Sequence, residues 1–325
     1  MLYVTTRNNQ EALTVQHVLN QSRGDDGGLY LPLHFPKLSS DDLKKLRELS
    51  FNQRIASILN LFFQSKLSGW DVDFSVGRYP VRLTDLSHRI FVGEFWHNLQ
   101  WKYDYLQEKL TELLSGEIKE DGSWTSIAIR MAILAAILLE RDETKTDKMD
   151  VATTIGDFSV PISAWYLRKM GFPVGNIICC CSENNQLWEL ICMGQMSLEW
   201  KIPVNFERLI SDCGGVKETA RFNLSGSNNG IYSASDLVLK TLRSNLHVSV
   251  VSGDRVETAV PNVFKTYDYV MQYESALAYC GLMDYRTKTG ITRPVVVICD
   301  YSPAVEAEKI SAWMNLSKEK LLDII

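Results

Sequence analysis

Residues 149–170 read MDVATTIGDFSVPISAWYLRKM, and this stretch decides the fold. Its start is typical of a buried strand, small and polar residues follow over 153–159, and the run from Pro161 to Met170 favours a helix. The alternation recurs later in the chain, in apolar runs at 176–181, 247–252 and 294–299 and in helical patterns at 234–242 and 303–314. It predicts an α/β fold with an open, mostly parallel sheet flanked by helices.

The loop over 153–159 is the first candidate for a binding site. In open parallel sheets, ligands lie beyond the carboxyl ends of the strands, so this loop and the one after the last apolar run are the places to search. Small residues there would let backbone N–H groups point at an anion, helped by the dipole of the next helix. A plain strand-to-helix turn explains the same residues, and both interpretations stay open.

Lys102 is the second candidate. It lies in an apolar series with steps of three and four, formed by Phe95, Leu99, Lys102, Leu106, Leu110 and Leu113. This spacing puts the ammonium within the apolar stripe of a helix. Burial lowers the pKa of a lysine, as a nucleophilic Schiff-base lysine requires. Alternatively, the stem covers apolar surface while the ammonium reaches water.

Composition excludes several classes of partner. The net charge is −5 and the pI about 5.6, so no overall basic surface faces nucleic acid or an anionic membrane. Neither the seven cysteines nor the five histidines show disulfide-framework or metal-ligand spacing. The start lacks the layout of an export signal, and the longest apolar stretch, 127–139, is too short for a bilayer. We expect a reduced, cytoplasmic protein without a metal centre.

The first part of the chain has a different texture. A glycine-rich passage over 24–32 precedes two helical patterns, one carrying Leu43 and Leu46 and one over 52–65. They predict a small, mostly helical N-terminal lobe over 1–90, followed by the α/β domain over 91–325. Two further stretches, 224–230 and 281–290, are typical of loops.

Several segments fall in the order of the motifs of the threonine synthase family. Residues 3–7 (YVTTR) and 26–32 (DGGLYLP) resemble the family's Y-x-S-T-R and D-G-G-L-Y-V-P. Residues 98–107 resemble T-L-A-F-K-D-F-A-L-Q, 154–174 resemble T-G-N-F-G followed by a helix and K-M-G-L-P-V, and 284–290 resemble D-P-H-T-A-V-G. Their common order is more specific than any single motif.

The resemblance implies a fold type II pyridoxal-phosphate (PLP) enzyme that converts O-phosphohomoserine and water into threonine and phosphate. It places Lys102 on the lysine that binds the cofactor covalently and later moves protons. The cofactor-binding residues that it implies are Thr154, Gly156, Asp157, Phe158 and Ser159 around the phosphate, and Thr287 at the pyridine nitrogen.

The sequence also departs from the family's pattern. Family members are longer, and the shortfall lies between Lys102 and Trp124, so we expect most of the mobile substrate subdomain to be missing. Asp157 replaces a neutral asparagine and Ser159 a glycine, which would set a carboxylate against the cofactor phosphate. Tyr103 replaces the acid that follows the lysine.

These departures predict that the family's reaction is impaired or lost and that PLP binding can be lost with it. The alternative function is that of a non-catalytic descendant that binds a partner protein or a small metabolite. The surface uncovered by the lost subdomain predicts self-association, in the simplest case as a homodimer.

Overall fold

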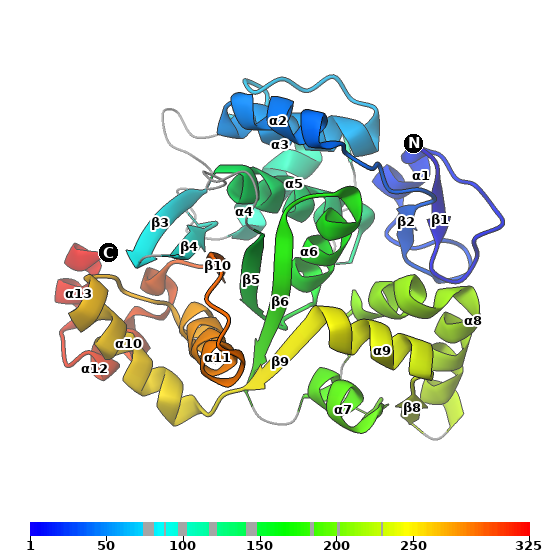
Figure 1. The fold of residues 1–325 in the computed structure, drawn as a ribbon. Helices are drawn as coiled ribbons and strands as arrows, with labels where there is room; N and C mark the ends of the chain where they lie inside the picture. The colour runs from blue at the N-terminus through cyan, green and yellow to red at the C-terminus, as the bar shows by residue number, and fades with distance from the viewer. Residues whose placement is uncertain are drawn as a thin grey trace.

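One sheet forms the centre of the molecule. The computed structural model describes residues 1–73, 81–87, 89–96, 103–116, 122–140, 148–182, 185–199, 202–228 and 230–325. In these ranges the largest sheet has six strands in the order β3-β4-β10-β5-β6-β9. They are β3 (Arg82–Ser87), β4 (Ile90–Glu94), β5 (Met149–Thr154), β6 (Val174–Cys181), β9 (Leu246–Val250) and β10 (Val295–Cys299). Only β3 runs antiparallel to its neighbour, which confirms the mostly parallel sheet (Figure 1).

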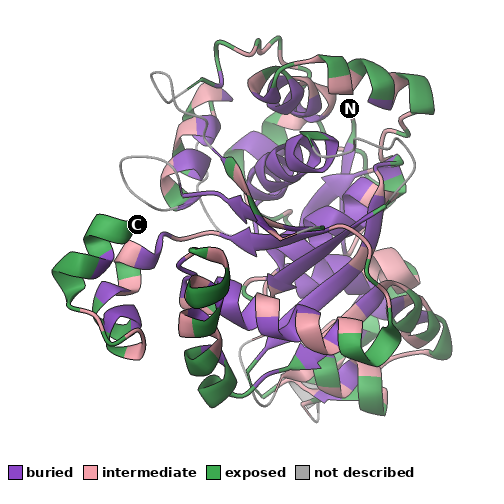
Figure 2. Ribbon diagram, turned by 60° about the vertical axis from the view of Figure 1, so that its left-hand side comes forward, coloured by how far each residue is buried: buried purple, intermediate pink, exposed green. Residues whose placement is uncertain are grey.

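Helices cover both faces of the sheet, as expected where parallel strands are buried on both faces. Alternate residues point to opposite faces: Val296 packs with one apolar cluster, whereas Val295 and Val297 pack with the other. The first face carries α3 (Phe51–Phe63), α4 (Tyr103–Leu113), α5 (Trp124–Glu140) and α6 (Ser159–Met170). The second carries α10 (Gly253–Tyr267), α11 (Tyr273–Thr289), α12 (Ala307–Trp313) and α13 (Lys318–Ile324). Figure 2 shows the buried strands between these layers.

The helix α5 is the most deeply buried helix described. Every residue from Trp124 to Leu139 is buried, so the longest apolar stretch of the sequence, 127–139, lies within this helix. Trp124 packs edge-on against Phe62 of α3, with ring centroids 5.4 Å apart. Arg130 is the one charged side chain in this buried run. Such a charge needs a partner, because burying it unpaired is costly.

The N-terminal region contains the predicted helices. α2 (Ser40–Glu48) and α3 each begin with a capping box, in which the N-cap serine and the third helical residue exchange hydrogen bonds. They follow α1 (Val15–Asn20) and a two-stranded antiparallel ribbon of β1 (Tyr3–Thr5) and β2 (Tyr30–Pro32). The division into 1–90 and 91–325 stays a prediction.

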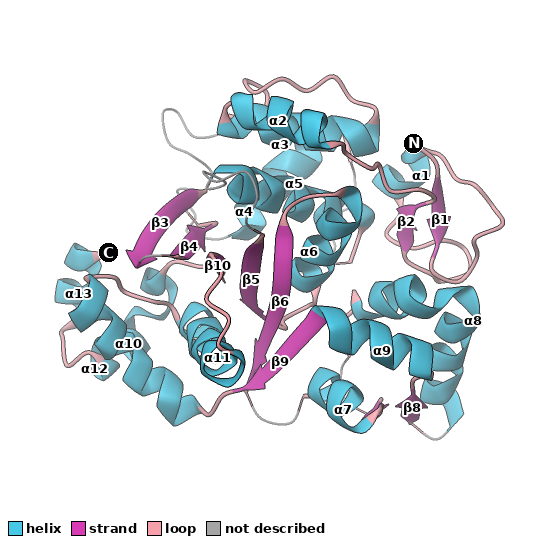
Figure 3. Cartoon of the chain, in the orientation of Figure 1, coloured by secondary structure: helices cyan, strands magenta, loops and turns pink. Residues whose placement is uncertain are grey.

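A smaller group of elements adjoins β9 at the far edge of the sheet (Figure 3). It consists of α7 (Gln186–Met193), β7 (Gln195–Ser197), α8 (Phe206–Asn228), β8 (Ile231–Ser233) and α9 (Asp236–Asn245). The loop predicted over 224–230 is wrong for 224–228, which form the end of α8. Small and polar residues there mimic a loop, but Phe222 anchors the helix in the core.

The loop predicted over 281–290 is also wrong. Residues up to Thr289 belong to α11, and Gly290 ends that helix in the left-handed conformation with φ of 70°. Leu282 and Tyr285 are both buried and lie three residues apart, on one face of the helix. The polar residues at the end of the segment, Thr287 and Lys288, are exposed.

The end of α6 gives a first prediction. Gly171 follows it with φ of 100°, and a Cβ there would lie 2.8 Å from the carbonyl oxygen of Leu38. We expect Gly171→Ala to lower the free energy of unfolding by about 1–3 kcal/mol, measured by urea denaturation. Gly290→Ala is the matched control, because Gly290 has φ of 70° and no atom within 4 Å of the added Cβ. Equal losses in both variants would show that the contact with Leu38 is unimportant.

No helix in the described part of the chain has both the length and the apolarity needed to cross a membrane.

Candidate functional site

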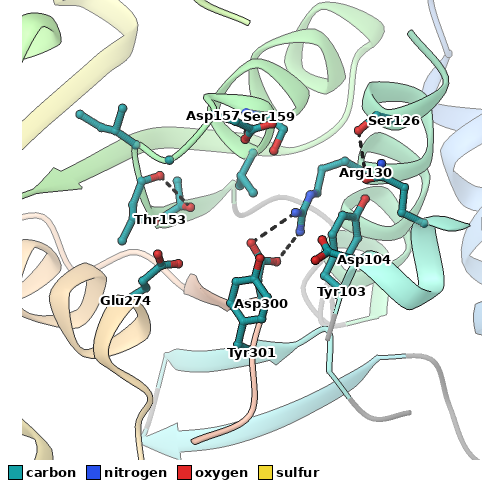
Figure 4. Close-up of a pocket in the computed structure, with 15 residues that line it drawn as sticks. Tyr103, Asp104, Ser126, Arg130, Thr153, Asp157, Ser159, Glu274, Asp300 and Tyr301 are labelled. Atoms are coloured by element: carbon teal, nitrogen blue, oxygen red, sulfur yellow. Dashed lines mark hydrogen bonds and ion pairs between the residues drawn. The ribbon is translucent and has the colours of Figure 1, made fainter. Parts of the chain in front are cut away.

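A cavity of about 170 Å³ opens at the carboxyl edge of the sheet, between the ends of β5 and β10. This is the edge at which the sequence predicts a ligand site. The residues in Figure 4 come from α4, α5, the end of β5, the loop into α6 and its first turn, the first turn of α11 and the segment after β10. They are Tyr103, Asp104, Gln107, Ser126, Arg130, Thr153, Thr154, Ile155, Gly156, Asp157, Ser159, Val160, Glu274, Asp300 and Tyr301.

The loop after β5 brings four predicted residues together at this cavity. Thr154, Gly156, Asp157 and Ser159 all line it. Phe158 does not, because its ring turns into the core and packs edge-on against Phe206, 5.5 Å away. Positive φ values at Gly156 (46°) and Phe158 (68°) turn the chain sharply, so that α6 begins at Ser159.

The carboxylate of Asp157 accepts a hydrogen bond from a backbone N–H at the start of α6. The backbone N–H of Ser159 donates to Asp157 Oδ1 at 2.9 Å. Asn205 binds the same residue, because its Nδ2 donates to the Asp157 carbonyl oxygen at 3.1 Å. Arg208, fully buried, donates to Asn205 Oδ1 and to the Tyr30 carbonyl oxygen. A donor that an anion would use at a helix N-terminus is therefore taken by the chain itself.

A buried ion pair forms another wall of the cavity. Both terminal nitrogens of Arg130 donate to Asp300, one of them at 3.2 Å. The guanidinium carbon of Arg130 also lies 3.4 Å from the centre of the Tyr103 ring. Burial works against the charge of Arg130, but Asp300, Tyr103 and Asp157 together outweigh it and leave the pKa of Arg130 raised. Burial likewise raises the pKa of Tyr103.

The described lining is strongly acidic. Asp104, Asp157, Glu274 and Asp300 stand against the single guanidinium of Arg130, so the formal charge of these lining residues is −3. The pKa of Glu274 is raised, first by burial and then by repulsion from Asp300 and Glu306. A negative potential of this kind favours a cation over an anion.

Two predicted residues are not among the described residues that line the cavity. Lys102 falls outside the described residues, although the next residue, Tyr103, begins α4 and lines the cavity. Thr287 is exposed in the last turn of α11, whereas Glu274 in the first turn reaches the cavity. At 1.5 Å per residue the two are about 20 Å apart along the helix. The structure does not bring Thr287 to this site, because the loop expected to carry it is a helix.

Sequence reasoning missed Arg130, Glu274, Asp300 and Tyr301. A single arginine in an apolar helix was a usable signal, since a buried guanidinium implies a carboxylate partner. Asp300 directly follows the last apolar run, at the edge where open sheets bind ligands. Glu274 had no such signal, because it begins a helix that the sequence analysis read in part as a loop.

Comparison with known proteins gives the class of the fold. The chain aligns over 100% of its length with 94% of PLP-bound threonine synthase from Brucella melitensis, at a TM-score of 0.83 and 16% identity. The chain also aligns over 99% of its length with 93% of threonine synthase from yeast, at a TM-score of 0.84 and 13% identity. At these identities the likeness shows the fold alone, which this chain shares with the two threonine synthases.

Sequence matches cover part of the chain. Residues 2–76 match the family described as threonine synthase N terminus. A 60-residue segment, 18% of this chain, is 35% identical to threonine synthase from Methylobacillus glycogenes and spans 13% of that enzyme. By sequence, the chain is similar to threonine synthases over part of its length, and over its whole length the similarity is one of fold.

The expectation of a missing subdomain has no support, because the alignments extend over 94% and 93% of the two solved chains. The homodimer was expected from the surface that such a loss would uncover. The homodimer stays a prediction, and the loss of a subdomain no longer supports it.

Proposed function

We propose that this chain is a non-catalytic member of the threonine synthase family, whose cavity takes a small ligand in place of PLP. The observation that carries the proposal is the Asp157 carboxylate, which accepts the Ser159 N–H at 2.9 Å where a cofactor phosphate would need donors. The acidic lining supports the same conclusion.

The described residues do not fit PLP. Its phosphate carries close to two negative charges at neutral pH. One like-charge pair at about 4 Å costs roughly 4 kcal/mol at an effective dielectric constant near 20. The cavity of about 170 Å³ is also small. A cavity of about 150 Å³ holds a benzene-sized ligand, and PLP has more than twice as many non-hydrogen atoms. O-Phosphohomoserine would bring a second phosphate to the same carboxylates.

The alternative function is the family's own reaction, with Lys102 holding PLP. One observation favours it: the shared fold with a PLP-bound threonine synthase, at a TM-score of 0.83. The two functions differ in a single measurable property, which is whether the chain holds the cofactor through Lys102.

The test is to add PLP to the purified protein and record its visible absorbance. We expect no Schiff-base band that depends on Lys102, and no phosphate release from O-phosphohomoserine. Lys109→Ala is the control, since Lys109 lies partly exposed on α4 and can react adventitiously. A band that Lys102→Ala removes and Lys109→Ala leaves would overturn the proposal. A band that survives Lys102→Ala agrees with it.

A further inference from the structure

We propose that the edge strand β9 pairs with β9 of a second copy of this chain, antiparallel and across a twofold axis that passes near Val248. The inference goes beyond the proposed function, because no residue of β9 lines the cavity and the pairing does not depend on PLP. It gives the predicted homodimer a surface that exists without the loss of any subdomain.

The strand β9 is an unprotected edge of the central sheet (Figure 1). In the described part of the chain it pairs with β6 alone, so its outer side leaves backbone N–H and C=O groups without a strand partner. Such an edge accepts a further strand unless charges, proline or a bulge protect it. The sequence of β9, LHVSV, has no lysine, arginine, aspartate, glutamate or proline, and its register with β6 is continuous.

The opposite edge of the sheet, β3, carries the protection that β9 lacks. Arg82 and Asp85 are exposed charged residues on β3, and the register with β4 shifts between Asp85 and Ser87. Exposed charges and an irregular register both discourage another strand from pairing there. The contrast between the two edges therefore singles out β9 as the edge that is suited to strand addition.

The apolar side chains of β9 fit an antiparallel pair. Leu246 and Val248 pack with the first apolar cluster, and Val250, on the same face by alternation, is 40% exposed. A register centred on Val248 sets Leu246 opposite Val250 of the second copy and buries that valine. The helix α7, which lies against β9, also exposes Trp188 and Met193. Pairing extends one apolar face across both copies and gives these side chains a surface to contact.

The charges that flank β9 favour a second copy in the antiparallel direction. Arg243 is exposed in the last turn of α9, just before the strand, and Asp254 is exposed in the first turn of α10, just after it. The register centred on Val248 sets position 243 opposite 253, so Arg243 lies next to Asp254 of the second copy. The twofold axis forms this contact twice. A parallel pair would instead set like charges together, which is unfavourable.

The nearest other charge does not cancel this pattern. Arg255 follows Asp254, but its guanidinium donates to both carboxylate oxygens of Asp284 in its own chain, at 2.7 and 2.9 Å. Its charge is therefore offset within the chain, and the carboxylate of Asp254 is left to face Arg243 of the second copy.

The experiment measures the oligomeric state of the full chain by sedimentation or light scattering from about 1 to 100 μM. We expect a dimer whose fraction rises with concentration, and hydrogen exchange of the β9 amides that slows as it forms. Val250→Lys should raise the dissociation constant at least about tenfold, because it sets a charge in the paired edge. Val305→Lys is the matched control, since Val305 is 47% exposed in the 3-10 helix η1 (Pro303–Glu306), outside β9.

A charge exchange tests the direction of pairing. Arg243→Glu should weaken the dimer about tenfold, and adding Asp254→Lys to it should restore most of the affinity. Arg243 Nε also donates to the Ile191 carbonyl oxygen at 2.8 Å. Because both variants lack that bond, the recovery measures the charges alone.

Three results would overturn the inference: a monomer over the whole concentration range, a dimer that Val250→Lys and Val305→Lys affect equally, or no recovery in the double variant. Far-UV circular dichroism checks that each variant is folded, and the charge exchange decides by itself if Val250→Lys is not. The PLP test is separate, because a cofactor band dependent on Lys102 refutes the proposed function and leaves this inference intact.

Discussion

Replacing Asp157 by asparagine should give a protein that binds inorganic phosphate at the start of α6, where the natural chain does not. Asparagine has the same shape, and its oxygen can still accept the Ser159 N–H that Asp157 accepts at 2.9 Å. The change therefore removes a charge and keeps the turn. A like-charge pair at about 4 Å is worth roughly 4 kcal/mol at an effective dielectric constant of 20. Because Asp157 is only half-buried, water screens part of this, and we expect a gain in affinity of about 100-fold.

The measurement is the shift of the thermal unfolding midpoint on adding inorganic phosphate, compared with chloride at equal ionic strength. A ligand that binds only the folded state raises that midpoint. The natural chain should show no phosphate-specific shift and Asp157→Asn a clear one. Asp254→Asn is the control, because Asp254 is an exposed acid in the first turn of α10. Equal shifts for the two variants would contradict the role of Asp157.

The strands of the parallel sheet could be predicted because each is a short apolar run between turn residues. β5, β6, β9 and β10 all lie where the sequence places them, and the cavity lies at the predicted edge. For such strands burial on both faces leaves a local signal, since most of their residues are apolar. The strand-to-helix loop after β5 could also be predicted, because it directly follows one of these apolar runs.

Helix α11 could not be predicted in full, and Thr287 was misplaced with it. The segment 281–290 is polar on one side, and its apolar side becomes visible only when Leu282 and Tyr285 pack in the core. The local composition is typical of a loop, but packing of the apolar side against the core stabilises a helix there. The resemblance to a family motif cannot correct such an error when identity is this low.

The acidic wall of the cavity was hidden for a different reason. Arg130 and Asp300 are 170 residues apart in the chain, and Glu274 reaches the cavity from a third element. Contacts of this kind depend on the arrangement of whole helices and strands. A sequence pattern records which residues are buried, but not which distant residue each one meets.

Arg130→Met should cause a large loss of stability, about 3–5 kcal/mol in the free energy of unfolding, measured by guanidinium denaturation. Methionine keeps the apolar stem but leaves Asp300 without its buried partner and removes the cation above the Tyr103 ring. Arg130→Lys should lose less stability than Arg130→Met but more than the natural chain. An ammonium keeps the charge, but it cannot form the two-bond pair with Asp300 or stack on the Tyr103 ring.

The double variant Arg130→Met with Asp300→Asn tests whether the ion pair itself contributes to the free energy of unfolding. Removing both charges avoids the uncompensated carboxylate, so we expect the double variant to recover more than half of the loss. If it recovers nothing, packing on Tyr103 carries the stability and the ion pair is incidental. If it matches the natural chain, the pair is not needed for folding, and the role of Arg130 is to offset the charge of Asp300 in the wall of the cavity.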